Sequence, residues 1–106
     1  MSNMNVLLVC GGGASSGFMA QNIRKAAKKR NISIDIKARS EAEIEEYLTE
    51  IDALLIGPHL AYMEADIREK IEPYHIPASI IDQSIYGLLD GNKGLDLILE
   101  LLKKEK

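Results

Sequence analysis

The segment with the clearest chemical potential begins at Cys10 and ends at Gly17. It reads, in order, Cys10, Gly11, Gly12, Gly13, Ala14, Ser15, Ser16 and Gly17. Glycines let a backbone approach a ligand closely, and successive N–H groups in such a loop can point into one concave space. If a helix follows, the positive end of its dipole favours anions, and Ser15 and Ser16 add hydroxyl donors. The segment is therefore suited to holding phosphoryl oxygens beside a sulfur.

The thiol of Cys10 is the candidate nucleophile. A cysteine at the start of a helix ionises more readily to its thiolate, and a thiolate can attack phosphorus and later leave again. The alternative is that Cys10 is a small buried hydrophobic residue, as lone cysteines usually are. The glycine-rich loop after it favours the functional interpretation. The same loop matches neither Gly-x-x-x-x-Gly-Lys-Ser/Thr nor Gly-x-Gly-x-x-Gly, which argues against a nucleotide site.

The composition narrows the class of protein. The chain has 106 residues, a formal net charge of −3 and one cysteine. One domain over residues 1–106 is expected, without a nucleic-acid partner, because a basic bias is missing. A single cysteine excludes an internal disulfide and a cysteine-rich zinc site. No signal peptide or membrane span is evident, so we expect a cytoplasmic protein without direct membrane insertion. No residue pattern calls for a metal or an organic cofactor.

The elements that position Cys10 alternate between strands and helices. Apolar or alternating runs predict four strands, at residues 5–9, 32–37, 53–56 and 79–81. Helical periodicity predicts four helices, at about residues 17–30, 40–49, 61–72 and 94–104. Ser40 fits a capping box for the second of these helices. The alternation predicts an α/β fold, a parallel sheet with helices on both faces. Its sites form beyond the carboxyl ends of the strands, where Cys10, Gly57-Pro58 and Asp82 would converge.

The sequence resembles the IIB components of the lactose/cellobiose branch of the phosphoenolpyruvate-dependent sugar phosphotransferase system. The resemblance covers nearly the whole chain. It rests on three motifs in order: Val-Leu-Leu-Val-Cys10 with its loop, Gly57-Pro58-His59-Leu60-Ala61-Tyr62-Met63, and Ile81-Asp82-x-x-x-Tyr86-Gly87.

The resemblance implies a flavodoxin-like three-layer fold with a four-stranded parallel sheet in the order 2-1-3-4. It implies that Cys10 accepts phosphate from a phosphohistidine of a IIA protein and passes it to a sugar held by the IIC membrane permease. The sugar would be a β-linked disaccharide of the cellobiose kind. Residues 11–17 would hold the phosphoryl group, and the site would be bordered by Pro58, His59, Tyr62, Asp82 and Tyr86.

Two positions depart from the family pattern. Gly17 stands where a hydroxyl residue is common, so a third hydroxyl donor is not expected. His59 stands where glutamine is common and brings an ionisable group to the site, where it would contact the phosphoryl group, contact a partner, or lie on the surface after a turn. Tyr62 and Tyr86 are expected to pack against the loops. Asp82 is expected to cap the last helix or fix a loop, because a carboxylate beside a phosphoryl group would repel it.

Two other functions remain open on the residues alone. A low-molecular-weight tyrosine phosphatase also places a cysteine between a strand and a phosphate loop, but its loop ends in an arginine six residues after the cysteine. Here that residue is Ser16, and no aspartate precedes a proline. A non-enzymatic regulatory or binding domain is the second alternative, because a fold does not fix a function. An apolar docking patch near Cys10, including Leu60, Met63 and Leu88, is expected of a carrier.

Overall fold

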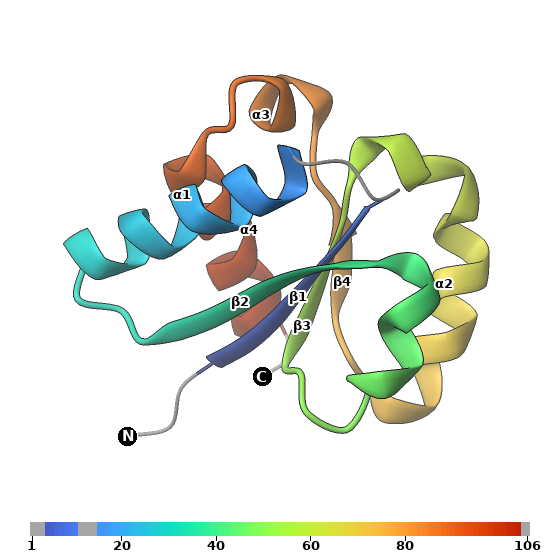
Figure 1. Ribbon diagram of the computed structural model, residues 1–106. Coiled ribbons are helices and arrows are strands. Elements are labelled where there is room, and N and C mark those ends of the chain that lie inside the picture. The colour runs from blue at the N-terminus through green and yellow to red at the C-terminus, as the bar shows by residue number, and fades with distance from the viewer. Residues whose placement is uncertain (1–3, 11–14, 105–106) are drawn as a thin grey trace.

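The sheet at the centre of the protein is entirely parallel (Figure 1). The structure is a computed structural model that describes residues 4–10 and 15–104. Its strands are β1 (Met4–Cys10), β2 (Ile34–Ser40), β3 (Ala53–Ile56) and β4 (Ala78–Ile80). Their spatial order is β2-β1-β3-β4. The predicted flavodoxin-like α/β fold and its strand order are confirmed.

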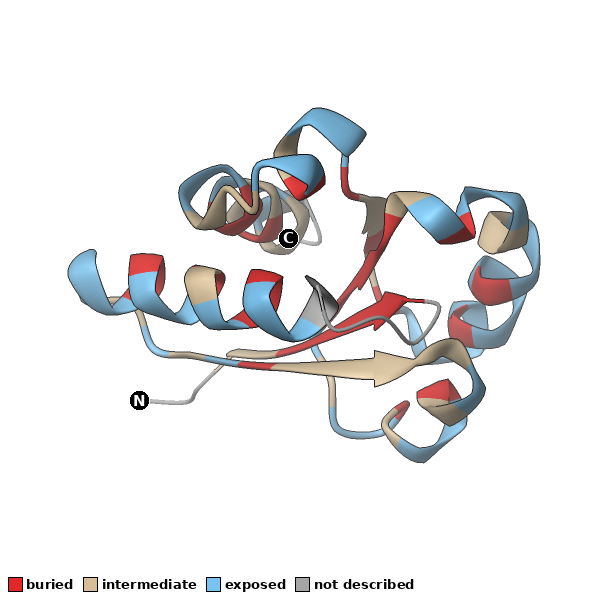
Figure 2. Cartoon of the chain, turned by 45° about the horizontal axis from the view of Figure 1, so that its top comes forward, coloured by how far each residue is buried: buried red, intermediate tan, exposed pale blue. Residues whose placement is uncertain are grey.

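The two central strands are buried on both faces, as their continuous apolar runs predict. In β1, Val6 and Leu8 belong to one hydrophobic cluster, whereas Leu7 and Val9 belong to the other. This split follows from the alternation of side chains along a strand. Figure 2 shows that burial is concentrated in β1 and β3, while β2 is only partly buried.

Different kinds of helix cover the two faces (Figure 1). The first face is covered by α1 (Ser15–Lys29) and α4 (Gly91–Lys104), with the short α3 (Gln83–Gly87) above them. The second face is covered by four shorter segments: η1 (Glu41–Glu46), η2 (Pro58–Met63), α2 (Glu64–Ile71) and η3 (Glu72–Tyr74). The η segments are 3₁₀ helices. Together with the sheet, these helices make the three expected layers.

The two long helices are close to their predicted positions. Helix α1 ends as predicted near Lys29, where Asn31 adopts φ 58° and the N–H of Ile32 donates to the carbonyl of Ala27 at 2.9 Å. This is the left-handed helix ending in which asparagine is tolerated. Helix α4 begins three residues earlier than predicted, because Asp90 caps it by accepting a hydrogen bond from the N–H of Lys93 at 3.1 Å.

The helix predicted at residues 40–49 is wrong in type. The capping box is present, since Ser40 accepts from the N–H of Ala42 and Glu43 accepts from the N–H of Ser40. The helix that follows is 3₁₀ and ends at Glu46. Only Ile44 is buried within it, so tertiary packing would add little stability to a longer α-helix here. A 3₁₀ helix also advances farther per residue, which suits a short connection between strands.

The helix predicted at residues 61–72 is interrupted. It starts earlier, at Pro58, as the 3₁₀ helix η2, and becomes α-helical only from Glu64. Leu60 has a non-helical backbone inside η2, because its side chain turns into the second hydrophobic cluster. Ile67 and Ile71 are buried as predicted, whereas Met63 is only half-buried.

Candidate functional site

Cys10 is the last residue of β1, at the carboxyl end of the sheet. It pairs with Ser40 of β2 and is 3% exposed. On its other side, the chain leaving β3 continues the ladder, because the N–H of Gly57 donates to the carbonyl of Val9 at 2.9 Å. The prediction that Cys10 and the Gly57-Pro58 turn meet at one end of the sheet is confirmed by this bond.

Gly57 lets the chain that leaves β3 lie close to Cys10. A Cβ atom on Gly57 would lie 3.3 Å from the carbonyl oxygen of Val9, 3.5 Å from Cβ of Cys10 and 3.7 Å from Nδ1 of His59. The bare glycine therefore separates the cysteine from the histidine without filling the space between them. The sequence predicted the Gly57-Pro58 turn at this end of the sheet, but not that the missing side chain of Gly57 would matter there. The signal was a glycine that directly follows a fully apolar strand.

His59 and Tyr86 meet beside this point. Their ring centroids are 5.1 Å apart and their planes are inclined at 80°, an edge-to-face contact. His59 is exposed, whereas Tyr86 is 6% exposed and belongs to the first hydrophobic cluster. The contact joins η2 to α3, two elements that reach the site from opposite faces of the sheet. Tyr86 packs against the site loops, as predicted.

Asp82 follows β4 and starts α3 rather than the last helix. Its side chain accepts hydrogen bonds from the backbone N–H of Ser84, at 3.1 Å, and from the Ser84 hydroxyl. These bonds lower the pKa of the Asp82 carboxyl, the side-chain bond having the largest effect. The prediction of a cap is confirmed, but the capped helix is the five-residue α3, which the apolar pattern of the sequence does not reveal.

The other predicted site residues are only partly placed. Gly11, Gly12, Gly13 and Ala14 lie outside the described residues. Ser15, Ser16 and Gly17 form the first turn of α1, two residues ahead of the predicted start. That turn contains no acidic residue, so no carboxylate of its own opposes an anion at the helix N-terminus. Pro58 begins η2 and is half-buried.

Large exposed apolar side chains belong to segments at this end of the sheet. Leu88 is 80% exposed directly after α3, and Phe18 is 57% exposed in the first part of α1. Tyr62 is 81% exposed on η2, so the prediction that it packs against the loops is wrong. Of the docking residues predicted from sequence, only Leu88 is fully exposed: Leu60 is 3% exposed and belongs to the core. Phe18 was not predicted from sequence, because it lies beside the apolar stripe of α1 rather than in it.

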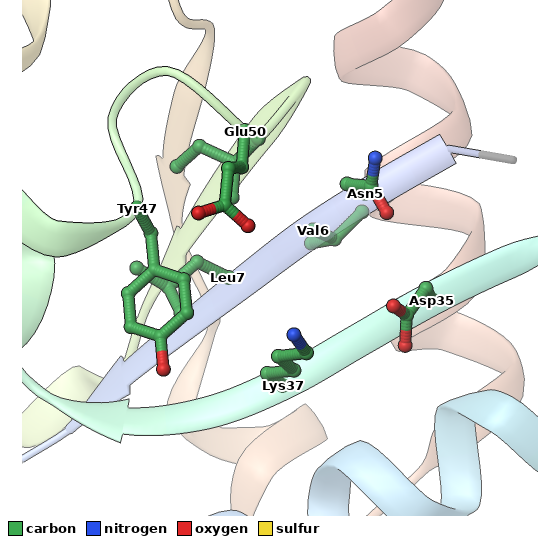
Figure 3. A pocket seen from close by; sticks show the side chains of 8 residues that line it. Asn5, Val6, Leu7, Asp35, Lys37, Tyr47 and Glu50 are labelled. Carbon is green, nitrogen blue, oxygen red and sulfur yellow. The ribbon is translucent and has the colours of Figure 1, made fainter.

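A separate pocket lies toward the start of β1 (Figure 3). It has a volume of about 100 Å³ and includes the side chains of Asn5, Asp35, Lys37, Tyr47 and Glu50. Lys37 lies 5.7 Å from the centre of the Tyr47 ring. None of the lining residues belongs to the predicted site, so this pocket is distinct from the end of the sheet that carries Cys10.

Two features are absent from the part of the chain that the structure describes, a cluster of metal-ligating side chains and a long apolar helix. There, no three side chains of histidine, cysteine, aspartate or glutamate gather into a possible metal site. Among the same residues, no helix is both long enough and apolar enough to cross a bilayer.

Comparison with known proteins identifies the class to which this fold and site belong. The family model described as "PTS system, Lactose/Cellobiose specific IIB subunit" matches residues 5–96. The chain belongs to this family, whose EIIB components act as phosphotransferases to the incoming sugar.

Individual relatives agree with the family. The PTS system cellobiose-specific EIIB component of Lactococcus lactis subsp. lactis (strain IL1403) is 30% identical over 100 residues, which is 90% of this chain and 93% of that protein. The PTS system oligo-beta-mannoside-specific EIIB component of Bacillus subtilis (strain 168) is 27% identical over 97 residues, covering 92% and 94%. The solution structure of a cellobiose-specific phosphotransferase IIB component from Borrelia burgdorferi superposes with a TM-score of 0.83 at 33% identity, covering 99% of this chain and 96% of that one.

Some relatives are longer than this chain. Proteins named PTS system lactose-specific EIICB component match it over 12% to 17% of their own length. In these relatives a IIB domain and a IIC component share one polypeptide.

Proposed function

We propose that Cys10 is the phosphoryl acceptor of this phosphotransferase component. The observation that carries the proposal is the place of Cys10, at the end of the central strand and five residues before α1 begins. An anion there is favoured by the amino end of the helix, and Gly57, the residue directly after β3, has no side chain beside Cys10. Among the described residues, Cys10 thus combines a nucleophilic thiol with an unoccupied side-chain position on Gly57 and the positive end of the α1 dipole.

The first transfer takes phosphate from a phosphohistidine of a IIA protein. The thiolate of Cys10 attacks phosphorus, the S–P bond forms, and the P–N bond breaks with its electron pair returning to the imidazole of IIA. Backbone N–H groups of residues 11–17 stabilise the oxygens of the transferred group. Catalysis of this kind is mostly positioning and electrostatics.

The second transfer reverses these roles. A hydroxyl of a β-linked disaccharide of the cellobiose kind, held by a IIC permease, attacks phosphorus. The S–P bond breaks, the thiolate is restored, and the hydroxyl proton leaves to a base or to solvent. A cellobiose-specific relative at 30% identity supports this class of sugar, and the relatives that join IIB to IIC support the permease as partner.

Docking is proposed to use the exposed side chains of Phe18, Tyr62 and Leu88. The three side chains are exposed on segments at the end of the sheet that carries Cys10, and aromatic residues are enriched in interfaces. Since Cys10 is 3% exposed, its sulfur must become more accessible when a partner binds. The same patch would serve IIA and IIC in turn, because both must reach one sulfur.

The test is phosphorylation of the intact protein. It is incubated with phosphoenolpyruvate, the general phosphotransferase proteins and a matching IIA, and its mass and ³¹P NMR spectrum are measured. We expect one added phosphoryl group with a phosphorus signal typical of an S–P bond, and its loss in Cys10→Ser. Thermal unfolding of Cys10→Ser checks that the variant folds.

The controls separate a failed partner from a failed proposal. Several IIA proteins are used, each shown to be phosphorylated itself. If none labels the protein, or if Cys10→Ser is still labelled, the assignment of Cys10 is wrong. A second variant, Ser33→Ala, should keep full labelling, because Ser33 is exposed beside the start of β1, at the end of the sheet opposite Cys10.

A further inference from the structure

His59 is placed to reach a group carried on Cys10. Its Nδ1 atom and Cβ of Cys10 both lie within 4 Å of one point, the position that a Cβ of Gly57 would occupy. A phosphoryl oxygen is attached to Cβ of Cys10 through the sulfur and the phosphorus, so it extends well beyond the cysteine itself. Because Gly57 has no side chain, no atom beyond its backbone stands between Cys10 and His59 at this point.

The ring of His59 is held in place, and neither of its nitrogens is hydrogen-bonded to another described residue. The edge-to-face contact with Tyr86 orients the ring, and Gly57 accepts a hydrogen bond from the N–H of Leu60 at 2.9 Å, which fixes the turn that carries it. Within the described ranges, no hydrogen bond occupies either nitrogen of His59. An imidazole oriented in this way can donate a hydrogen bond to an anion that is bound beside it.

We propose that His59 contacts the phosphoryl group on Cys10 and donates a hydrogen bond from its imidazole to a phosphoryl oxygen. This rests on the proposed function, in which Cys10 carries the group. No bond to His59 forms or breaks: the S–P bond remains on Cys10, and the imidazole stabilises the negative oxygens during both transfers. A protonated imidazole makes a charge-assisted bond, which is stronger than a neutral one.

The charged form of His59 should therefore be favoured when phosphate is present. Among the described residues, the titratable groups that the structure places against His59 are Cys10 of β1, across Gly57, and Tyr86 of α3. Neither is a carboxylate. Phosphorylation adds a dianion at this position, and a nearby opposite charge stabilises a protonated imidazole.

The first experiment needs no variant. The ring protons of His59 are followed by NMR as pH is changed, in the unmodified protein and in the protein phosphorylated by IIA. We expect the midpoint of the His59 titration to rise by about 1 pH unit on phosphorylation, while His75, at the end of η3, does not move. An unchanged His59 midpoint in protein shown to be phosphorylated would overturn the proposal.

Two substitutions of His59 separate the role of its aromatic ring from the role of its N–H donor. His59→Phe keeps a ring against Tyr86 and removes the donor, whereas His59→Gln keeps an N–H donor without the charge. We expect His59→Phe to slow phosphoryl transfer from IIA by about tenfold, His59→Gln to recover most of the rate, and the rate of His59→Gln to lose the pH dependence of the original protein. Equal rates for His59→Phe and the original protein would contradict the proposal.

The control is the second histidine. His75 has φ 55°, and asparagine tolerates that backbone, so His75→Asn should leave the transfer rate unchanged. Failure of the proposed function is recognised separately: then Cys10→Ser is labelled like the original protein, or neither is labelled. Label that remains in Cys10→Ser and disappears on further substitution of His59 would make His59 an acceptor itself and overturn both proposals.

Discussion

The two faces of the sheet are covered by helices of very different regularity. The first face has α1 and α4, with 15 and 14 residues, and a cluster of buried side chains that includes Met19, Ile23 and Leu95. The second face has segments of six, six, eight and three residues. Both clusters consist of buried apolar side chains, but the second is assembled from short segments: η1 and η2 each bury one side chain, α2 buries two and η3 buries none.

This difference in regularity gives the two faces different roles in the site. Long packed helices resist local opening, and short segments with few buried contacts open more readily. The first face therefore fixes the start of α1 behind Cys10. The second face supplies η2, whose exposed His59 and Tyr62 lie next to the site. Binding residues are commonly carried by irregular segments on a rigid scaffold.

The largest expected effect comes from removing one buried isoleucine on each face. Ile23 and Ile67 are 0% and 1% exposed. Ile23→Ala should lower the free energy of unfolding by about 4 kcal/mol and Ile67→Ala by about 2 kcal/mol, because the short α2 can shift to fill part of its cavity. Urea unfolding of the two variants measures both values. A loss for Ile67→Ala equal to or larger than that for Ile23→Ala would break the comparison.

A glycine at the start of α4 tests the close packing of the first face. A Cβ on Gly91 would overlap the carbonyl of Asn22, and would lie 2.9 Å from Cβ of Asn22. Gly91→Ala must separate α1 from α4 and should cost about 2 kcal/mol of unfolding free energy. Its matched control is Gly87→Ala, because nothing lies within 4 Å of a Cβ there and a change within about 0.5 kcal/mol is expected. A neutral Gly91→Ala would mean that the two helices are loosely packed.

The smallest effect comes from one surface ion pair on each face. Arg30, directly after α1, pairs with Asp96 of α4 at 2.7 Å, with side chains 34% and 59% exposed. Glu64 and Arg68 pair within α2 at 2.8 Å, with side chains 38% and 47% exposed. Asp96→Asn and Glu64→Gln should each cost below about 1 kcal/mol.

The cost should be larger for Asp96→Asn, since Arg30 also reaches Asn92 at the start of α4. Unfolding at low salt and at about 1 M salt measures the contribution, which should vanish at high salt because exposed charges are screened. A contribution that survives in high salt would contradict an electrostatic origin.

The regular face was the more predictable one from sequence. Apolar periodicity located α1 and α4, and continuous apolar runs located β1 and β3, because in these elements the pattern and the burial coincide. The second face was less predictable: the connection after Ser40 became a 3₁₀ helix and the segment from Pro58 became two helices. Tertiary packing decided both, through single anchors such as Ile44 and Leu60.

The candidate site was predictable in its chemistry and less so in its geometry. Cys10 and its loop are visible in the sequence because residue type and spacing reveal them. The resemblance placed His59 at the border of the site, but the position of its ring relative to Cys10 is not visible in the sequence, since it depends on the missing side chain of Gly57 and on the ring of Tyr86, which follows His59 by 27 positions. Short helices such as α3 also escape periodicity, because five residues do not complete an apolar stripe.

The two outer strands bear on the colloidal behaviour of the protein. An open sheet leaves unpaired N–H and C=O groups along its borders, which can template aggregation with other chains. Here β4 has only three residues and is preceded by Pro77, which has no N–H to offer. The longer β2 carries Asp35, Lys37 and Arg39 at alternate positions. One border is thus too short to recruit a foreign strand and the other too charged, so the chain should remain dispersed when it is concentrated.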